Sequence, residues 1–336
     1  MNNWLTLPLE ERKVILQNIS EEREKNSIPD YAIEKDWWVT MVLKALFSVD
    51  CADSLLFKGG TSLSKGWGLI ERFSEDIDIA LNHRFFTQTT PANNSQFKKL
   101  RTTCRKYVIE TLAQQLDQEL RTLGLFDYEV QPLLEIDGIP VSSEADPSVI
   151  LVNYHSISEN RSTYVPPTVK VEVSCLSMDV PFEQKHITTI ISEKYPDDDQ
   201  NTDCKIPTVC PTRTFLEKAF LLCEEFQKTK PRSLRMSRHL YDLEKLMDTE
   251  YGRSALVDRE LYSTIIEHRR KFYHSGYADY DKNYPEQIEI LPPTSLRKDW
   301  NNDYTELISS FIYGKFLTFE ELLERIEELQ ARFRNL

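Results

Sequence analysis

The residues best suited to do chemistry are two aspartates in an alternating segment. Residues 74–81 read Ser-Glu-Asp-Ile-Asp-Ile-Ala-Leu, which predicts a β-strand with Asp76 and Asp78 on one face and the isoleucines on the other. Two carboxylates about 7 Å apart on one strand face repel each other unless a cation lies between them. The pair therefore predicts a divalent-cation site, and the alternative is a solvated strand edge.

Glycines gather just before these aspartates. Four of the nine glycines in the chain fall between residues 59 and 68, after an apolar segment at 55–57 and at the start of a predicted helix at 61–65. A strand, a Gly59-Gly60 turn and a helix start leave backbone N–H groups exposed at the positive end of a helix dipole, which suits phosphate oxygens. The spacing is neither that of a Walker A loop nor that of a dinucleotide-binding loop. An ordinary tight turn is the alternative.

A third carboxylate lies on a second alternating segment. Residues 169–174 read Val-Lys-Val-Glu-Val-Ser, so the valines mark a buried face and Glu172 lies on the opposite one. If this strand pairs with residues 76–81, the three acids converge into a site of hard oxygen ligands. Such a site fits Mg²⁺ bound together with a nucleoside triphosphate (NTP).

The order of these motifs resembles that of the AbiEii/AbiGii-type nucleotidyltransferase toxins, which belong to the DNA polymerase β-like superfamily. The resemblance covers residues from about 30 to 245, and we recognise no motif in the segment after about 250. The matching segments are Gly59-Gly60 with Asp76 and Asp78, then Lys170-Val171-Glu172, Thr214 to Lys218, Arg238 to Leu243, and Glu34 to Thr40 near the N-terminus.

This resemblance implies an α+β fold with a mixed sheet flanked by helices, and a C-terminal helical domain that contributes to the active site. It implies a Mg²⁺-dependent nucleotidyltransferase of the EC 2.7.7 type, with Mn²⁺ as an alternative metal. The expected reaction moves a nucleoside monophosphate from an NTP to the 3′ end of tRNA, which arrests growth or defends against phage. A cognate antitoxin protein is a further expected partner. The alternatives are transfer to a protein or a small molecule, and a non-catalytic regulatory protein on the same scaffold.

The resemblance also implies a role for each candidate residue. The expected metal ligands are Asp76, Asp78 and Glu172. Asp242 is expected either to orient Lys218 or to accept the acceptor proton, and both residues count with the three acids as catalytic. Contacts to the triphosphate are expected from Gly59, Gly60, Thr61, Ser74 and Lys65.

A basic segment lies beside the predicted catalytic aspartate Asp242. Residues 227–241 contain five lysines and arginines and no acid, although the whole chain carries a net charge of −13. Such a basic strip attracts a polyanion, either the triphosphate or an RNA end. We expect Arg232, Arg235 and Arg238 to contact RNA, and the basic helix 98–106 could extend the track. The alternative is a solvated basic linker.

Length and composition limit the possible number of domains and the possible location of the protein. At about 150 residues per domain, a chain of 336 residues is expected to form about two domains. We place the boundary between residues 1–205 and 206–336, at the acidic loop 194–207. We expect this loop to be solvent-exposed. The longest apolar stretch, 37–47, is too short for a membrane span, and the N-terminus lacks the pattern of a signal peptide. The sequence therefore predicts a cytoplasmic protein without membrane contact.

The remaining elements follow from periodicity and from cap residues. Three helices are predicted in the N-terminal part, at 8–25, 30–48 and 95–123. Further strands are predicted at 126–134, 148–155, 168–176 and 186–192. Four helices are predicted in the C-terminal part, at 211–227, 236–249, 253–273 and 318–334.

Overall fold

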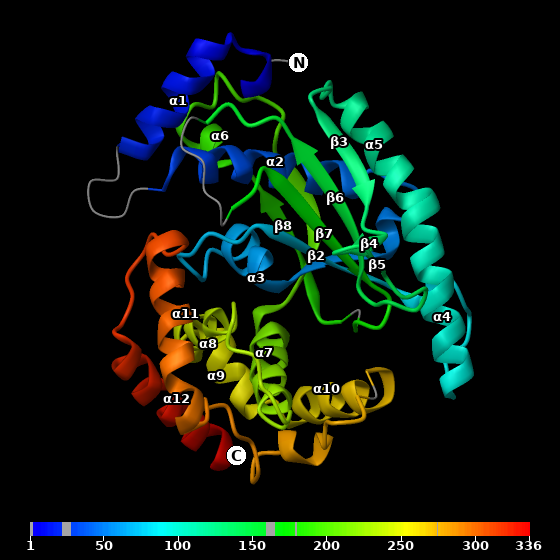
Figure 1. Cartoon of the computed structure of the whole chain (residues 1–336), viewed down its shortest axis with the longest axis vertical. Helices are drawn as coiled ribbons and strands as arrows, with labels where there is room; N and C mark the ends of the chain where they lie inside the picture. The colour runs from blue at the N-terminus through cyan, green and yellow to red at the C-terminus, as the bar shows by residue number, and fades with distance from the viewer. Residues whose placement is uncertain (1–2, 22–27, 159–164, 179, 274) are drawn as a thin grey trace. The chain divides into compact units, whose positions relative to one another are not determined.

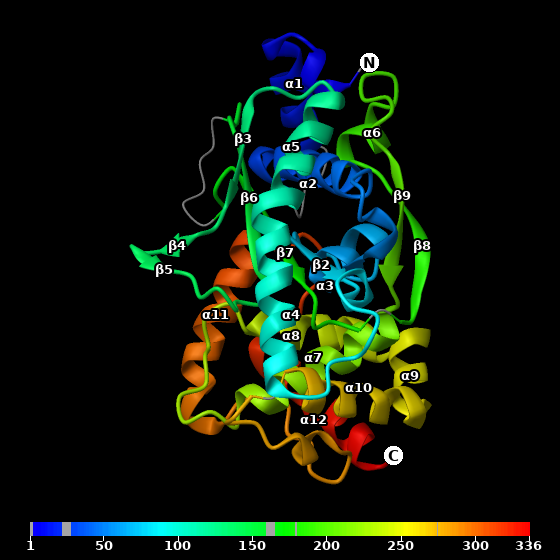
Figure 2. The same ribbon diagram turned by 90° about the vertical axis from the view of Figure 1, so that its right-hand side faces the viewer.

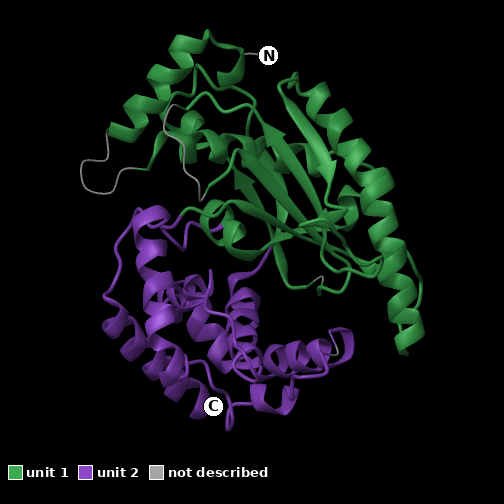
Figure 3. Ribbon diagram, in the orientation of Figure 1, with its two compact units in different colours: residues 1–66, 73–208 green, residues 67–72, 209–336 purple. Residues whose placement is uncertain are grey.

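The computed structural model describes residues 3–21, 28–158, 165–178, 180–273 and 275–336. Within it the chain forms two compact units, coloured green and purple in Figure 3. The first unit comprises residues 1–66 and 73–208, and the second comprises residues 67–72 and 209–336. The short segment Trp67–Arg72 therefore belongs to the second unit, although the chain on both sides of it belongs to the first.

The first unit contains both helices and strands (Figure 1). Its helices are α1 (Leu9–Glu21), α2 (Asp30–Leu46), α3 (Gly59–Thr61), α4 (Asn94–Tyr107), α5 (Ala113–Thr122) and α6 (Ile190–Lys194). Its strands are β1 (Leu55–Lys58), β2 (Asp76–Leu81), β3 (Tyr128–Pro132), β4 (Glu135–Ile136), β5 (Ile139–Pro140), β6 (Ser148–Tyr154), β7 (Thr168–Ser174), β8 (Phe182–Ile187) and β9 (Cys204–Val209). A π-helical turn, Val108–Leu112, joins α4 to α5, so the predicted helix at 95–123 is one long helical stretch (Figure 2).

Seven of these strands form a mixed sheet in the order β3-β6-β7-β2-β1-β9-β8. β2 runs parallel to β7 and antiparallel to β1. Burial alternates along β6 and β7, as the alternating sequence predicts. The expected α+β class, with a mixed sheet flanked by helices, is confirmed.

Helix α2 packs against β2 and β7 and carries two of the largest side chains of the first unit's core. Trp37 and Trp38 are fully buried, and the ring of Trp38 stacks on Tyr154 of β6 with 5.0 Å between ring centroids. Aromatic side chains bury large areas and hold an element firmly in its packing. Helix α2 is therefore a fixed support beneath the middle of the sheet.

The second unit is helical. Its helices are α7 (Pro211–Glu225), α8 (Ser237–Met247), α9 (Glu250–Val257), α10 (Arg259–Phe272), α11 (Arg297–Ser310) and α12 (Phe319–Arg334). Helix α7 packs against α8, α9 and α10, and its Phe215 stacks on Phe333 of α12 with 5.8 Å between ring centroids. A capping box begins α12, since Thr318 and Glu321 exchange hydrogen bonds.

Several expected boundaries were wrong, and helices α6 and α11 were missed. The strand expected at 186–192 ends at Ile187, because the Thr189 side chain caps helix α6 by accepting a hydrogen bond from Ser192 N. The helix expected at 253–273 is two helices, divided at Asp258, whose side chain caps α10. Helix α11 was not predicted.

The acidic loop also differs from its prediction. Strand β9 occupies its last residues, and Asp199 is only 1% exposed. The Asp199 carboxylate accepts hydrogen bonds from Trp4 N, Trp37 Nε1 and Thr189 Oγ1 at 3.1, 2.9 and 2.5 Å. A buried carboxylate with three donors is stable, so this acid ties the loop to α2 rather than facing solvent. Among the described residues, no helix is both long and apolar enough to cross a membrane.

Candidate active site

The predicted carboxylates lie on neighbouring parallel strands. Asp76 and Asp78 are half-buried and share one face of β2, while the residues between and after them are buried. In the pairing of β2 with β7, Asp78 lies opposite Glu172 and Asp76 lies opposite Lys170. The two strands therefore do pair, which was the condition for a site of three acids, and the pairing brings these acids to one part of the sheet.

Lys170 is the counter-ion of this carboxylate group. Its ammonium pairs with the Glu172 carboxylate. Burial lowers the pKa of Lys170, but the negative charges of Glu172, then Asp76 and Asp78, outweigh burial and raise it overall. The sequence alternation placed Lys170 on this face, yet it was not among the candidate site residues.

Gly59 allows the glycine turn to approach Asp78 closely. Gly59 has φ +80°, and a Cβ atom built on it would lie 2.0 Å from Asp78 Oδ2. Lys58, at the end of β1, lies opposite Asp78 in the antiparallel pairing of β1 with β2. A side chain at position 59 would therefore be strained and would also displace the carboxylate. Gly60 follows in the first turn of α3.

Thr61 and Ser74 hold the start of β2. The fully buried Thr61 hydroxyl donates to the Asp76 carbonyl and lies 2.8 Å from Ser74 Oγ. These bonds connect the glycine turn to the backbone of the first aspartate. Contacts of Thr61 and Ser74 with phosphate stay predictions.

The Lys65 ammonium pairs with Asp36 of α2, and both side chains are less than 10% exposed. Lys65 lies in the π-helical turn Ser62–Gly66 that follows Gly59 and Gly60. The predicted contact of Lys65 with phosphate stays a prediction. In the structure its charge is used to attach this turn to α2.

In the second unit, the candidate residues Lys218 and Asp242 are in contact. Lys218 Nζ of α7 lies 2.8 Å from Asp242 Oδ2 of α8. Arg72 also binds Asp242 with two hydrogen bonds, from Nε to Oδ1 at 2.7 Å and from Nη2 to Oδ2 at 2.8 Å. All three residues are buried.

Charge pairing bears on the two roles considered for Asp242. Burial alone would raise the pKa of Asp242, but Arg72 and Lys218 lower it well below its usual range. Burial lowers the pKa of Lys218. A carboxylate held ionised by two cations is a poor proton acceptor at neutral pH. The geometry therefore favours Asp242 as the residue that orients Lys218.

Arg72 was not among the predicted site residues, although its position in Arg-Phe-Ser-Glu-Asp, directly before the aspartates, was a signal that could have identified it. A further neighbour is His239, whose pKa is lowered well below its usual value by burial and by Lys218 and Arg238. Arg72, Lys218 and Asp242 form a buried group of two cations and one carboxylate, so the net charge of the group is positive.

The predicted basic strip is partly neutralised. Lys228 and Arg232 pair with the Glu225 carboxylate at 2.8 and 2.7 Å. These two cations outweigh burial and lower the pKa of Glu225 to about 2. Arg235 is attached through its backbone N–H to Asp303. Helix 98–106 is similar, since Lys98 and Arg101 both pair with Glu144, and the buried Arg105 donates to the Leu133 carbonyl.

The carboxylates of β2 fit a metal that a nucleotide helps to hold. Within the described residues, no three His, Cys, Asp or Glu side chains are arranged to bind a metal ion, and Glu172 pairs with Lys170. Asp76 and Asp78 nevertheless offer two oxygen ligands on one strand face. Mg²⁺ commonly uses one or two carboxylates together with substrate phosphates and water, so this donor set suits a metal bound with its nucleotide.

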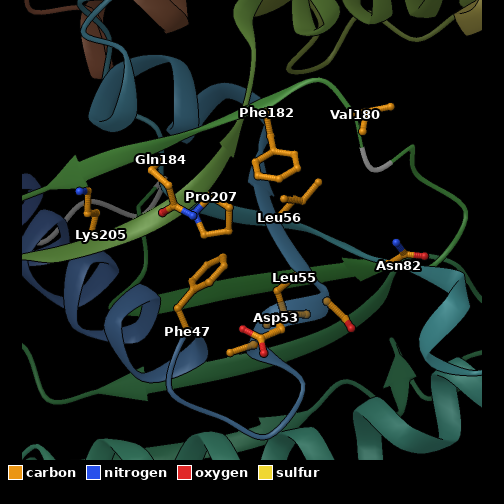
Figure 4. A pocket seen from close by; sticks show the side chains of 12 residues that line it. Phe47, Asp53, Leu55, Leu56, Asn82, Val180, Phe182, Gln184, Lys205 and Pro207 are labelled. Atoms are coloured by element: carbon orange, nitrogen blue, oxygen red, sulfur yellow. The ribbon is translucent and has the colours of Figure 1, made fainter.

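A separate cavity of about 380 Å³ lies at the opposite end of β1 and β2 (Figure 4). Leu55 and Asn82 line it, whereas Lys58 and Asp78 lie at the other end of this strand pair. Its wall combines apolar side chains, such as Phe47 and Phe182, with polar ones. The cavity contains none of the predicted site residues.

Residues 42–325 match the protein family described as the nucleotidyl transferase AbiEii toxin of type IV toxin–antitoxin systems. Among solved structures, the chain is similar to MenT4, a nucleotidyltransferase toxin from Mycobacterium tuberculosis H37Rv. The two chains share 16% sequence identity with a TM-score of 0.45, over 96% of this chain and 97% of that chain. No curated protein matches the chain in sequence.

Proposed function

Because the chain belongs to the AbiEii family of nucleotidyl transferase toxins of type IV toxin–antitoxin systems, we propose that it transfers a nucleoside monophosphate from an NTP to the 3′ end of tRNA. The family resemblance drawn from the motifs is confirmed by this match, and it implies an NTP substrate and an antitoxin. The observation that carries the proposed chemistry is the face shared by Asp76 and Asp78 on β2, with Glu172 opposite Asp78 on β7.

The proposed reaction is an in-line displacement at the α-phosphorus of the NTP. The oxygen of the acceptor hydroxyl forms a bond to the α-phosphorus, the bond to the bridging oxygen of the β-phosphate breaks, and pyrophosphate leaves. The hydroxyl proton passes to water. A divalent metal held with the nucleotide would neutralise charge on the phosphates. The task of the protein is therefore to position groups and to balance charge.

We assign this task to residues on the two strands and the glycine turn. Asp76 and Asp78 would hold the metal. Glu172 would complete the site when the negative charge of the nucleotide attracts Lys170 away from it. Gly59 and Gly60 would present backbone N–H groups to phosphate oxygens. In the second unit, Lys218 would add positive charge and Asp242 would orient it.

The acceptor is proposed from charge. A chain with a net charge of −13 repels a polyanion over most of its surface. The stretch 227–241 contains basic residues and no acidic one, so it can attract a polyanion locally. Arg232 supports this proposal because its side chain is 62% exposed even while it pairs with Glu225. The Arg235 and Arg238 side chains belong to the same stretch, and we propose that all three contact the acceptor RNA.

The test is incubation with each of the four NTPs, labelled at the α-phosphate, together with Mg²⁺, total tRNA and a cell lysate. The expected product is tRNA that carries label at its 3′ terminus. A matched control is tRNA whose terminal ribose has been oxidised by periodate, which removes the acceptor hydroxyl and should abolish labelling. Label found only on protein or on small molecules would contradict the tRNA assignment, while transfer itself would stand.

A further inference from the structure

Helix α2 buries several charged residues, and two consecutive ones were not among the candidate site residues. Lys35 and Asp36 are 1% and 5% exposed, directly before the buried Trp37 and Trp38. Burying a charge is costly unless it is paired and hydrogen-bonded. Their partners therefore indicate why the helix retains them.

Lys35 joins the starts of the two strands that carry the acids. Its ammonium lies 2.6 Å from Glu75 Oε2 and 3.0 Å from the Pro166 carbonyl oxygen. Glu75 directly precedes Asp76 of β2, and Pro166 lies just before β7, which carries Glu172. One ammonium group thus connects α2 to both parallel strands at the edge where both begin.

Asp36 attaches the glycine turn to the same helix. One carboxylate oxygen binds the Lys65 ammonium, and the other accepts a hydrogen bond from Ile190 N at 2.9 Å. Lys65 lies in the turn that follows Gly59 and Gly60. Consecutive residues of α2 therefore hold the phosphate-facing turn and the starts of both acidic strands.

The helix that carries them is itself fixed. Trp37 Nε1 donates to Asp199 Oδ1 at 2.9 Å, and Trp38 stacks on Tyr154. A group attached to α2 is consequently attached to the core of the first unit. Small displacements of such groups matter, because a shift of about 1 Å in a reacting group can lower a rate about 10²-fold.

We propose that Lys35 and Asp36 are positioning residues, which set the carboxylates of β2 and β7 and the glycine turn in their relative places without touching substrate. The proposal rests on the proposed function of that site. A buried ion pair is often dispensable for stability when both partners are replaced by apolar residues, whereas removal of one partner leaves an unpaired charge. This difference separates a positioning role from a merely stabilising one.

The test compares Lys35→Met with the double variant Lys35→Met/Glu75→Leu. The single variant is expected to lower the melting temperature, because the buried Glu75 carboxylate loses the ammonium that neutralises it. The double variant should recover most of that loss. If Lys35 positions the strands, kcat for transfer stays about 10²-fold below wild type in the double variant, while KM for NTP changes far less. A wild-type kcat in a stable double variant would overturn the proposal.

Lys44→Met is the matched control. Lys44 lies on the same helix, and its ammonium also binds backbone carbonyls, those of Asn201 and Asp203. These carbonyls lie in a loop that carries no proposed catalytic residue, so kcat should remain at the wild-type value. A drop in kcat equal to that of the double variant would show a general effect of α2 and would also overturn the proposal.

A second readout separates this proposal from the proposed function. Amide hydrogen exchange in the peptide 73–82 measures how firmly β2 is held in place, and the measurement needs no substrate. The double variant should exchange faster there than wild type at equal global stability, and unchanged exchange would contradict positioning. If the wild-type protein labels no acceptor with any NTP, the proposed function fails, and the exchange result still decides whether Lys35 fixes the strand.

Discussion

Gly59 shows how a single atom constrains the site. Its φ of +80° disfavours any other residue, and the Asp78 carboxylate occupies the place of a Cβ atom. The backbone of the turn can therefore lie against the carboxylate that we propose holds the metal. No side chain at this position would leave both features intact.

We predict that Gly59→Ala lowers transfer more than stability explains. The left-handed conformation should cost about 1–2 kcal/mol, and displacement of Asp78 should reduce kcat further. Gly124→Ala is the control, because Gly124 has φ +83° and nothing within 4 Å of a built Cβ atom. Free energies of unfolding and transfer rates of both variants give the comparison. Equal rates in the two variants at equal stability would argue against the close approach as a functional feature.

Asp242 gives a second prediction at this scale, concerning pH. Its pKa in the folded protein is lowered below the unfolded value of about 3.9. Its contribution to stability is therefore complete well above pH 4 and is lost as the pH falls toward the folded-state pKa. Asp242→Asn should destabilise the protein by roughly 3–5 kcal/mol at neutral pH, because Arg72 and Lys218 lose their buried counter-charge.

Urea unfolding from pH 7 down to about pH 3.5 measures both effects. The wild-type protein should lose more stability over this range than the Asn variant, whose residue 242 cannot titrate. Parallel pH profiles for the two proteins would contradict the linkage. A transfer rate in wild type that follows a group titrating between about pH 5 and 8 would have to come from a residue other than Asp242.

At the scale of elements, the basic strip gives a prediction about RNA. Replacing Arg232, Arg235 and Arg238 with Gln should weaken tRNA binding and make it less dependent on salt. The slope of log affinity against log salt should fall by about 0.7–0.9 for each phosphate that the protein no longer neutralises. Binding of Mg²⁺ and NTP should change little.

The control variant replaces three arginines of α12, Arg325, Arg332 and Arg334, with Gln, so that the change in charge is the same. These arginines also pair with acidic residues. This variant should bind tRNA with the wild-type affinity and salt dependence. An unchanged tRNA affinity in the strip variant would remove the reason for placing RNA there.

Alternating sequence was enough to predict the strands that carry the acids. β2 and β7 each bury one face, so period two is visible in their residues. β9 was missed because its residues follow several aspartates, one of which, Asp199, is buried through donors distant in sequence. Helix α11 was missed because its polar sequence buries only Trp300, Tyr304 and Leu307.

The site was predictable where chemistry is local and unpredictable where it depends on tertiary contact. Asp76, Asp78 and Glu172 follow from strand faces, whereas Lys218 and Asp242 were implied by the family resemblance. Arg72 and Lys35 were not recognised, because their partners lie 170 and 40 residues away in sequence. The signal that could have identified Lys35 is its position directly before two tryptophans in an apolar helix.

At the scale of the whole molecule, the proposed catalytic residues are divided between the two units. The carboxylates belong to the first, whereas Arg72, Lys218 and Asp242 belong to the second. The segment Trp67–Arg72 belongs to the second unit and leads directly into Phe73 and the strand that carries Asp76. Within the first unit, we propose that the β2 carboxylates are indispensable for transfer.

The most direct test of this account is transfer by Asp76→Asn and Asp78→Asn, measured with α-labelled NTP, Mg²⁺ and tRNA. Both side chains are half-buried, and the amides keep their size, so the melting temperature should stay close to that of wild type. We predict that labelling of tRNA falls to background in both variants, as it should for wild type when the metal is removed by chelation. Full labelling by either folded variant, with Mg²⁺ still required, would contradict the assignment of these aspartates as the centre of the active site.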